Sequence, residues 1–292
     1  LRLAELITEA GLPENVLTLV NGDKSVVDLI LQSPDISSVS FVGSTPVAKY
    51  IYTECAKYNK RVQALGGAKN HMLIMEDANL EDAVNGLIGA AFGSAGERCM
   101  ATSVAIPIGK IQKPFMDLLK EKASTIKVGE SLDPQSEMGP LITKEHKQKV
   151  LSYIEKGIKE GADLEMDGRK ISLQGFENGN FIGPTIFNNV KTDMTIYKEE
   201  IFGPVLSVVN MDNFDEAMEK LIKYGSIELQ IKSYKKEKYS WINSGFIVIE
   251  REIIKDLIKL KNKLYKWMIL NKNYILNSCN HWGDEIIFSA IF

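Results

Sequence analysis

Cysteine and histidine are scarce in this 292-residue chain, which has three of each. The cysteines, Cys55, Cys99 and Cys279, are an odd number at unrelated spacings, which argues against a disulfide framework. The three histidines lie far apart in the sequence, so their spacing predicts no metal site. The chemistry of the chain therefore has to be sought outside these two classes of site.

Long apolar runs are also lacking, and the N-terminus has no signal-peptide pattern. The formal net charge is only −3, which argues against a nucleic-acid-binding surface. With 45% hydrophobic residues, the chain can bury a substantial core in one large or two ordinary domains. We expect a soluble protein that binds neither nucleic acid nor membrane and is cytoplasmic, or in the mitochondrial matrix of a eukaryote.

Proline is absent after Pro204, and only three of the 22 glycines follow Gly203. All three tryptophans lie at or after Trp241. This shift suggests a different origin for the last part of the chain, and we expect residues 224–292 to be an unmatched, aberrant tail; a divergent domain is the alternative. At the other end, the chain starts inside a helical pattern without an initiator methionine, so we expect it to be truncated there.

Segments with helical spacing alternate with short β-rich segments along the chain. Helices are expected over residues 1–10, 25–32, 46–57, 79–91, 112–126 and 144–160. Strands are expected over residues 16–20, 38–42, 61–65, 103–108 and 180–187. Such alternation with short connections predicts an α/β fold with a parallel sheet covered on both faces, in which ligands lie beyond the carboxyl ends of the strands.

The segment Phe92-Gly-Ser-Ala-Gly-Glu-Arg-Cys-Met100 contains a turn of small residues followed by Cys99, the cysteine of greatest interest. A thiol acts as a nucleophile in its thiolate form, which a nearby cation or oriented backbone N–H groups favour. Arg98 and the glycine turn can supply both for Cys99. The alternative is that Cys99 is a small buried apolar residue, as most free cysteines are.

Two other segments carry groups suited to a nucleotide. In Gly43-Ser-Thr45, the glycine permits close backbone approach, and Ser44 with the N–H groups of the next helix can bind a pyrophosphate; a helix N-cap is the alternative. In Lys198-Glu-Glu-Ile-Phe-Gly-Pro-Val205, a carboxylate and a ring lie two residues apart, on one side of an extended segment. Glu200 can accept hydrogen bonds from a ribose and Phe202 can pack on a nicotinamide, whereas a solvated charge and a core residue are the alternatives.

Three segments in this order, Arg61–His71, Phe92–Met100 and Lys198–Val205, resemble the aldehyde dehydrogenase family. The pairings Gly-Ala-Lys-Asn-His and Gly-Glu-Arg-Cys-Met are typical of its CoA-acylating methylmalonate-semialdehyde (malonate-semialdehyde) dehydrogenase branch. The resemblance runs from Leu1 to about Lys220. It implies the C-terminal part of a Rossmann-like, NAD-binding domain over residues 1–67 and an α/β catalytic domain over residues 68–223. The family is homo-oligomeric, but its oligomerisation strand is not recognisable here.

The resemblance also implies roles for individual residues. Cys99 corresponds to the catalytic nucleophile and Arg98 to the residue that binds the substrate carboxylate. Contacts with NAD are implied for Gly43, Ser44, Glu200 and Phe202. The implied reaction oxidises malonate or methylmalonate semialdehyde with decarboxylation and passes the acyl group from a cysteine thioester to coenzyme A, giving acetyl-CoA or propionyl-CoA, as in valine catabolism.

The water-activating glutamate of hydrolytic relatives has no counterpart in this sequence. In their pattern Glu-Leu-Gly-Gly, its position is Ala64 when matched on the double glycine and Leu65 when matched backwards from Lys69. Neither side chain accepts a proton, which leaves the acyl group to another nucleophile such as the thiol of coenzyme A. The alternatives are a hydrolytic enzyme in which Glu97 or Glu200 is the base, and a catalytically dead fragment.

Overall fold

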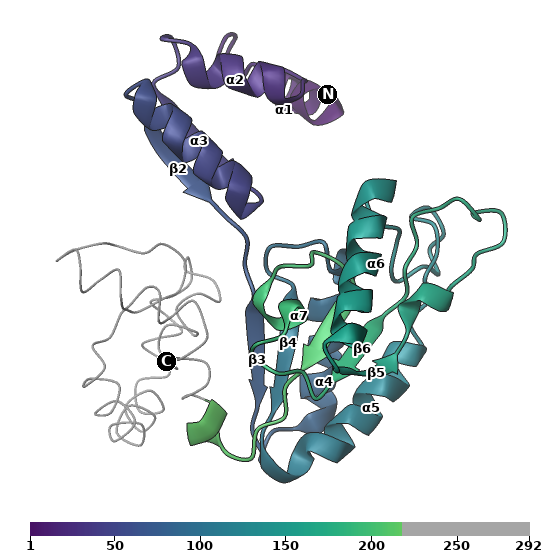
Figure 1. Ribbon diagram of the computed structural model, residues 1–292. Helices are drawn as coiled ribbons and strands as arrows, with labels where there is room; N and C mark the ends of the chain where they lie inside the picture. Colours follow the sequence, from purple (N-terminus) through teal and green to yellow (C-terminus); the bar gives the residue numbers. More distant parts are fainter. Residues whose placement is uncertain (218–292) are drawn as a thin grey trace, which may run out of the picture. The chain divides into compact units, whose positions relative to one another are not determined.

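The computed structural model describes residues 1–217 and divides the chain into two compact units, Leu1–Lys69 and a second unit that begins at Asn70 (Figure 1). The sequence places the change of domain after Gly67, and the division follows Lys69. The tail expected over residues 224–292 lies outside the described residues. The two units are described in turn.

The first unit contains three helices and a pair of strands. Its elements are α1 (Arg2–Glu9), α2 (Lys24–Gln32), β1 (Ser38–Val42), α3 (Thr45–Lys57) and β2 (Arg61–Leu65). The strands pair in parallel, from Ser38 opposite Arg61 to Val42 opposite Leu65. A small core of Leu31, Ile51 and Cys55 forms where α2 and α3 pack, with partly buried residues of β1 and β2 against it. The helices and strands predicted for residues 25–65 are confirmed.

The strand predicted over residues 16–20 is wrong, because that segment is irregular in the structure. Val16 and Val20 are 65% and 60% exposed. β-branched residues favour a strand only where a neighbouring strand accepts their backbone hydrogen bonds and a core covers one face. Within residues 1–217, no strand pairs with this segment.

The second unit is built on one five-stranded sheet. Its elements are β3 (Asn70–Ile74), α4 (Leu80–Phe92), the 3₁₀ turn η1 (Gly93–Gly96), β4 (Thr102–Pro107), η2 (Gly109–Ile111), α5 (Gln112–Ser124), α6 (Lys144–Lys159), β5 (Asp163–Met166), η3 (Gly168–Lys170), β6 (Thr185–Asn188), α7 (Thr195–Lys198) and β7 (Val205–Val208). The strand order is β3-β4-β7-β6-β5. All neighbours are parallel except β5, which runs antiparallel to β6 at the edge. The predicted parallel sheet is thus confirmed.

Helices cover this sheet, as the burial of its central strand shows. All four residues of β7 are buried, which requires cover on both faces. Helix α4 packs on α5 and β4, and α6 packs on α7. Figure 1 shows α6 beside the short helix α7. None of the helices within residues 1–217 is long and apolar enough to cross a membrane.

Helix ends follow the capping residues that the sequence offers. The side chain of Asn79 accepts a hydrogen bond from Asp82 N–H at 3.4 Å to start α4, and Thr143 accepts from His146 N–H at 3.1 Å to start α6. The three helices predicted in this unit are confirmed. The strand predicted over residues 180–187 begins only at Thr185, because the proline before it, Pro184, has no N–H to donate to a neighbouring strand.

Candidate functional site

Cys99 follows a left-handed turn between α4 and β4. Ser94, Ala95 and Gly96 have φ angles of 51°, 53° and 70°. This conformation costs a residue with a Cβ roughly 1–2 kcal/mol, so Ser94 and Ala95 are strained. Strain of this kind persists where the surrounding structure enforces it, and it is concentrated at functional sites.

The turn brings the cysteine to the surface. Cys99 is exposed, whereas Cys55 in the first unit is fully buried. Burial raises the pKa of the Cys55 thiol, which makes it a poor nucleophile. The exposure of Cys99 excludes the alternative in which it is a buried apolar residue.

Asn70, the first residue of β3, holds the chain on both sides of Met100. Its side-chain amide donates hydrogen bonds to the carbonyl oxygen of Cys99 at 2.9 Å and to that of Ala101 at 3.1 Å. Each side-chain amide hydrogen thus has a carbonyl partner, and the side chain of Asn70 has no N–H left to stabilise an oxyanion. These two hydrogen bonds fix the backbone at Cys99.

Arg98 folds back on the turn and leaves the end of its guanidinium unpaired. Its Nε donates to the hydroxyl of Ser94 at 3.0 Å, and its Nη1 lies beside Gly93. No carboxylate within residues 1–217 lies at ion-pair distance from Arg98, so the alternative of a structural pair with Glu97 or Glu200 is excluded for this part of the chain. The two Nη groups are therefore placed to hold a carboxylate ligand.

Glu97, two residues before the cysteine, faces a histidine from α6. Its Oε1 accepts a hydrogen bond from Ile142 N–H at 3.3 Å and lies 3.4 Å from His146 Nε2. Burial raises the pKa of the Glu97 carboxyl above its usual range. The same His146 nitrogen lies 2.5 Å from the carbonyl oxygen of Phe202. His146 therefore stands between the cysteine turn and the segment that contains Phe202.

The segment with Phe202 lies directly against the cysteine turn. A Cβ on Gly96 would come within 2.3 Å of the carbonyl oxygen of Gly203. Phe202 itself has a φ of 60° and is 37% exposed. The prediction that Glu200 and Phe202 share one side of an extended segment is wrong, because a left-handed residue breaks the alternation of side chains. The structure nevertheless brings Phe202 and the turn of Cys99 together.

This site lies at the amino ends of parallel strands. The turn of Cys99 leads into β4, the segment of Phe202 leads into β7, and Asn70 begins β3. Strands β4 and β7 are parallel neighbours, with Val104 opposite Ser207. The candidate residues of this unit thus lie on the segments that enter the strands, whereas the sequence predicts a ligand beyond the carboxyl ends.

Gly43 and Ser44 follow the carboxyl end of β1 in the first unit. Ser44 occupies the N-cap position of α3, but its hydroxyl accepts no capping hydrogen bond from the helix. Beside it, the Thr45 hydroxyl accepts from Gly67 N–H at 3.0 Å and so ties the double-glycine segment to the start of α3. The Ser44 hydroxyl is therefore exposed and is not used to cap the helix.

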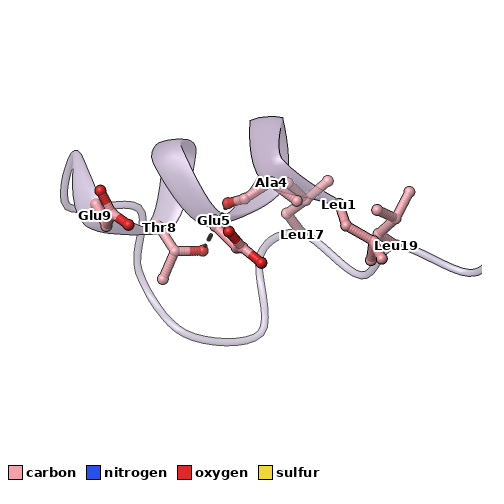
Figure 2. Close-up of a pocket in the computed structure, with 7 residues that line it drawn as sticks. All are labelled: Leu1, Ala4, Glu5, Thr8, Glu9, Leu17 and Leu19. Atoms are coloured by element: carbon pink, nitrogen blue, oxygen red, sulfur yellow. Dashed lines mark hydrogen bonds between the residues drawn. The ribbon is translucent and has the colours of Figure 1, made fainter.

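A shallow hollow in the first unit lies beside α1 (Figure 2). Its lining consists of Leu1, Ala4, Glu5, Thr8, Glu9, Leu17 and Leu19. Figure 2 shows the Thr8 hydroxyl donating to the carbonyl oxygen of Ala4, at 3.0 Å. No predicted site residue lines this hollow, and we assign no chemistry to it.

Comparison with known proteins settles the family. The model of the aldehyde dehydrogenase family matches residues 1–221. The chain belongs to the aldehyde dehydrogenase family. The match ends next to Lys220, where the sequence resemblance was expected to stop.

Among relatives of this aldehyde dehydrogenase chain are malonate-semialdehyde dehydrogenases of two bacteria. That of Halalkalibacterium halodurans is 53% identical over 218 residues, and that of Pseudomonas aeruginosa is 51% identical over 220 residues. Each alignment covers 75% of this chain and 44% of the relative. The chain therefore spans less than half the length of these two relatives.

Solved structures of aldehyde dehydrogenases agree with the fold. A Sinorhizobium meliloti protein, described as a methylmalonate-semialdehyde dehydrogenase in complex with NAD, is 50% identical with a TM-score of 0.74 and covers 81% of this chain and 50% of that chain. Betaine aldehyde dehydrogenase of Staphylococcus aureus in complex with NAD⁺ is 32% identical with a TM-score of 0.71, over 75% of this chain and 44% of that chain. The α/β fold predicted for this family member is confirmed.

Two residues of the site carry no signal in the sequence pattern. Asn70 lies in a segment that marks the family but shows no chemistry by its spacing, and His146 is one polar residue in an amphipathic helix. Their contacts join residues 29 and 56 positions apart. Only the sheet order and the packing of α6 bring these partners together.

Proposed function

We propose that this chain carries the nucleophile and the substrate arginine for NAD-dependent, CoA-acylating oxidation of malonate or methylmalonate semialdehyde. The observation that carries this proposal is the exposed Cys99 next to an arginine whose terminal nitrogens have no carboxylate partner within the described residues. A semialdehyde of this class has one carboxylate close to its aldehyde, which matches that pair. The names of relatives more than 50% identical to the chain support the substrate class.

Cys99 attacks the aldehyde carbonyl in its thiolate form, forming a C–S bond and placing negative charge on the aldehyde oxygen. That oxyanion needs hydrogen-bond donors. The backbone N–H of Cys99 has no acceptor among residues 1–217 and can donate to it. Arg98 holds the substrate carboxylate by two parallel hydrogen bonds and so orients the aldehyde toward the thiol.

Each unit separately offers groups that suit one part of a dinucleotide. The free hydroxyl of Ser44 and the N–H groups at the start of α3 suit a pyrophosphate next to Gly43, and the Glu200 carboxylate suits a ribose. The partly exposed ring of Phe202 suits a nicotinamide. NAD, when bound, accepts the hydride of the aldehyde carbon. A thioester on Cys99 is then left.

The last steps transfer the acyl group. The β-carboxylate of the substrate leaves as carbon dioxide and a proton replaces it on carbon, after which the thiol of coenzyme A takes the acyl group and Cys99 regains its proton. Strand β2 offers no base for hydrolysis: Ala64 lies on the half-buried side of the strand and Leu65 on the exposed side. An uncharged strand at these positions supports transfer to a thiol over hydrolysis.

The test is NADH formation by the purified 292-residue chain with malonate semialdehyde, with and without coenzyme A. Turnover that requires coenzyme A supports the proposal. Equal turnover without it identifies a hydrolytic enzyme, and no turnover by a folded chain means that this polypeptide alone is not the enzyme. The Cys99→Ala variant is the control. Restoring a carboxylate by Ala64→Glu or Leu65→Glu should raise acyl-enzyme hydrolysis without coenzyme A.

A further inference from the structure

One stripe of helix α6 contacts the segment Glu199–Gly203, which carries the proposed NAD contacts. The stripe consists of His146, Val150 and Tyr153. Residues at these spacings of four and seven lie on one face of a helix. Helix α6 therefore holds the segment along its length, rather than at a single point.

The polar contacts hold both ends of the segment. The Tyr153 hydroxyl donates to Glu199 Oε2 at 2.6 Å, and the His146 ring lies 2.5 Å from the Phe202 carbonyl oxygen through Nε2. Because a carbonyl oxygen only accepts hydrogen bonds, His146 Nε2 carries the hydrogen and donates. The edge of the His146 ring also meets the Phe202 ring, with centroids 6.2 Å apart.

On helix α6, the residue that makes the apolar contact, Val150, lies between His146 and Tyr153. A Cβ on Gly203 would come within 2.7 Å of Val150 Cγ2, so the segment passes next to the helix at this point. The backbone of Gly203 is also the surface on which Gly96 packs. Helix α6 and the cysteine turn therefore hold this segment between them.

His146 is the member of the stripe that reaches the cysteine turn as well. Its Nε2 lies 3.4 Å from Glu97 Oε1, and both side chains are about 15% exposed. Glu97 is held in turn by Ile142 N–H, in the segment before α6. A single ring nitrogen thus faces the carboxylate next to the nucleophile and the carbonyl of the residue proposed to line the nicotinamide.

We propose that His146 is a positioning residue: its Nε2–H holds the Phe202 carbonyl, and with it the Phe202 ring, in place relative to the turn of Cys99. Its effect on turnover rests on the proposed function, whereas the link between the two segments does not. Alanine removes the donor. Glutamine keeps an N–H donor near the position of Nε2 and carries no charge, so it should restore the link.

The kinetic test compares the KM for NAD and kcat of His146→Ala, His146→Gln and Gln148→Ala in the full chain. Gln148 is an exposed residue of the same helix and serves as the matched control. His146→Ala should raise the KM for NAD about two- to tenfold, the usual effect of one lost hydrogen bond, with a smaller change in kcat. His146→Gln should stay within about twofold of wild type. Equal effects of alanine and glutamine would overturn the proposal.

A second measurement does not depend on activity. Amide hydrogen exchange, followed by mass spectrometry, should rise in peptides covering residues 93–100 and 199–205 together in His146→Ala. It should stay at the wild-type level in His146→Gln and Gln148→Ala. This pattern in a chain that forms no NADH would reject the proposed function and support the role of His146. Exchange that rises in neither peptide, or in only one, would overturn the role of His146.

Discussion

The carbonyl oxygen of Gly203 lies where a side chain on Gly96 would have to be. A Cβ at Gly96 would come within 2.3 Å of that oxygen and 3.1 Å of the Ala91 carbonyl oxygen. The first distance is shorter than real Cβ atoms show, and the second is tighter than most Cβ contacts. The absence of a side chain at this one position therefore lets the cysteine turn rest on the segment of Phe202.

Gly96→Ala should accordingly destabilise the protein. The alanine must adopt a φ near 70°, and its methyl group must displace the Gly203 backbone. We expect a loss of about 2 kcal/mol or more in the free energy of unfolding, measured by urea denaturation. Gly86→Ala in α4 is the control: nothing lies within 4 Å of its added Cβ, and alanine favours a helix, so stability should rise by up to about 1 kcal/mol. Equal stability of the two variants would contradict the packing.

Cys99 should be the reactive thiol of the described residues. Iodoacetamide at neutral pH should label Cys99 and spare Cys55, which is buried with a raised pKa. Peptide mass spectrometry locates the label, and Cys279→Ser removes the thiol that lies outside the described residues. Cys99→Ala should abolish labelling in this background. Persistent labelling of Cys55 in folded protein would contradict the burial seen here.

Arg98 should select for a carboxylated aldehyde. Arg98→Leu, in a chain that forms NADH, should lower kcat/KM for malonate semialdehyde by about 10- to 100-fold more than for propanal, since a charge-assisted pair contributes roughly 1.5–3 kcal/mol. Arg98→Lys keeps the charge but not the two parallel hydrogen bonds, so its loss should be intermediate. A uniform loss for both aldehydes would show that the carboxylate is bound elsewhere.

Asn70 can be tested by a nearly isosteric change. Asn70→Asp replaces the amide donor by an ionised carboxylate that faces the carbonyl oxygens of Cys99 and Ala101. We expect a loss of about 1–3 kcal/mol in the free energy of unfolding at pH 7. Asn70→Ala, which removes the donors without adding charge, is the comparison and should lose less. If aspartate is tolerated better than alanine, the two hydrogen bonds are not what holds the turn.

Tyr197→Phe should stabilise the chain. The Tyr197 hydroxyl is buried with no hydrogen-bond partner within residues 1–217, and its ring meets His71 edge-on. Removing it should raise the free energy of unfolding by about 1 kcal/mol at pH 7. Tyr153→Phe is the opposite control, because it loses a 2.6 Å hydrogen bond to Glu199. Similar losses in both variants would contradict an unpaired Tyr197.

The same residue gives a prediction for alkaline pH. Burial raises the pKa of Tyr197 from 10.0 to about 12, so the folded state favours the neutral phenol. This contribution to stability is complete below pH 10 and is lost as the pH rises toward 12. Urea unfolding at pH 9, 10 and 11 should show a shallower decline for Tyr197→Phe than for wild type. Parallel declines would exclude this tyrosine as a source of alkaline instability.

Local patterns in the sequence predict many of the helices and strands of this fold, but few of the contacts that bring the segments of the site together. Helices with Asn79 and Thr143 as N-caps begin where expected, because a cap and its helix are neighbours in the chain. The strand predicted at Val16 fails for want of a partner. The prediction of an extended segment at Phe202 fails for a related reason, since the left-handed backbone of Phe202 is held by contacts with α6 and with the cysteine turn. Such contacts have no local signature.

The parallel pairing of β4 and β7 also determines how the segments before these two strands are aligned with each other. Each residue advances a strand by about 3.3 Å, so a slip of one residue between the two strands would move the backbone before β4 by that length against the backbone before β7. Cys99 lies three residues before β4 and Phe202 three residues before β7. The offset of the Cys99 backbone from the Phe202 backbone along the strands is thus set by the register of the backbone hydrogen bonds, which does not depend on the side chains that the strands carry. Substitutions within the strands can then accumulate without shifting these two backbone segments along each other, as long as the register is kept.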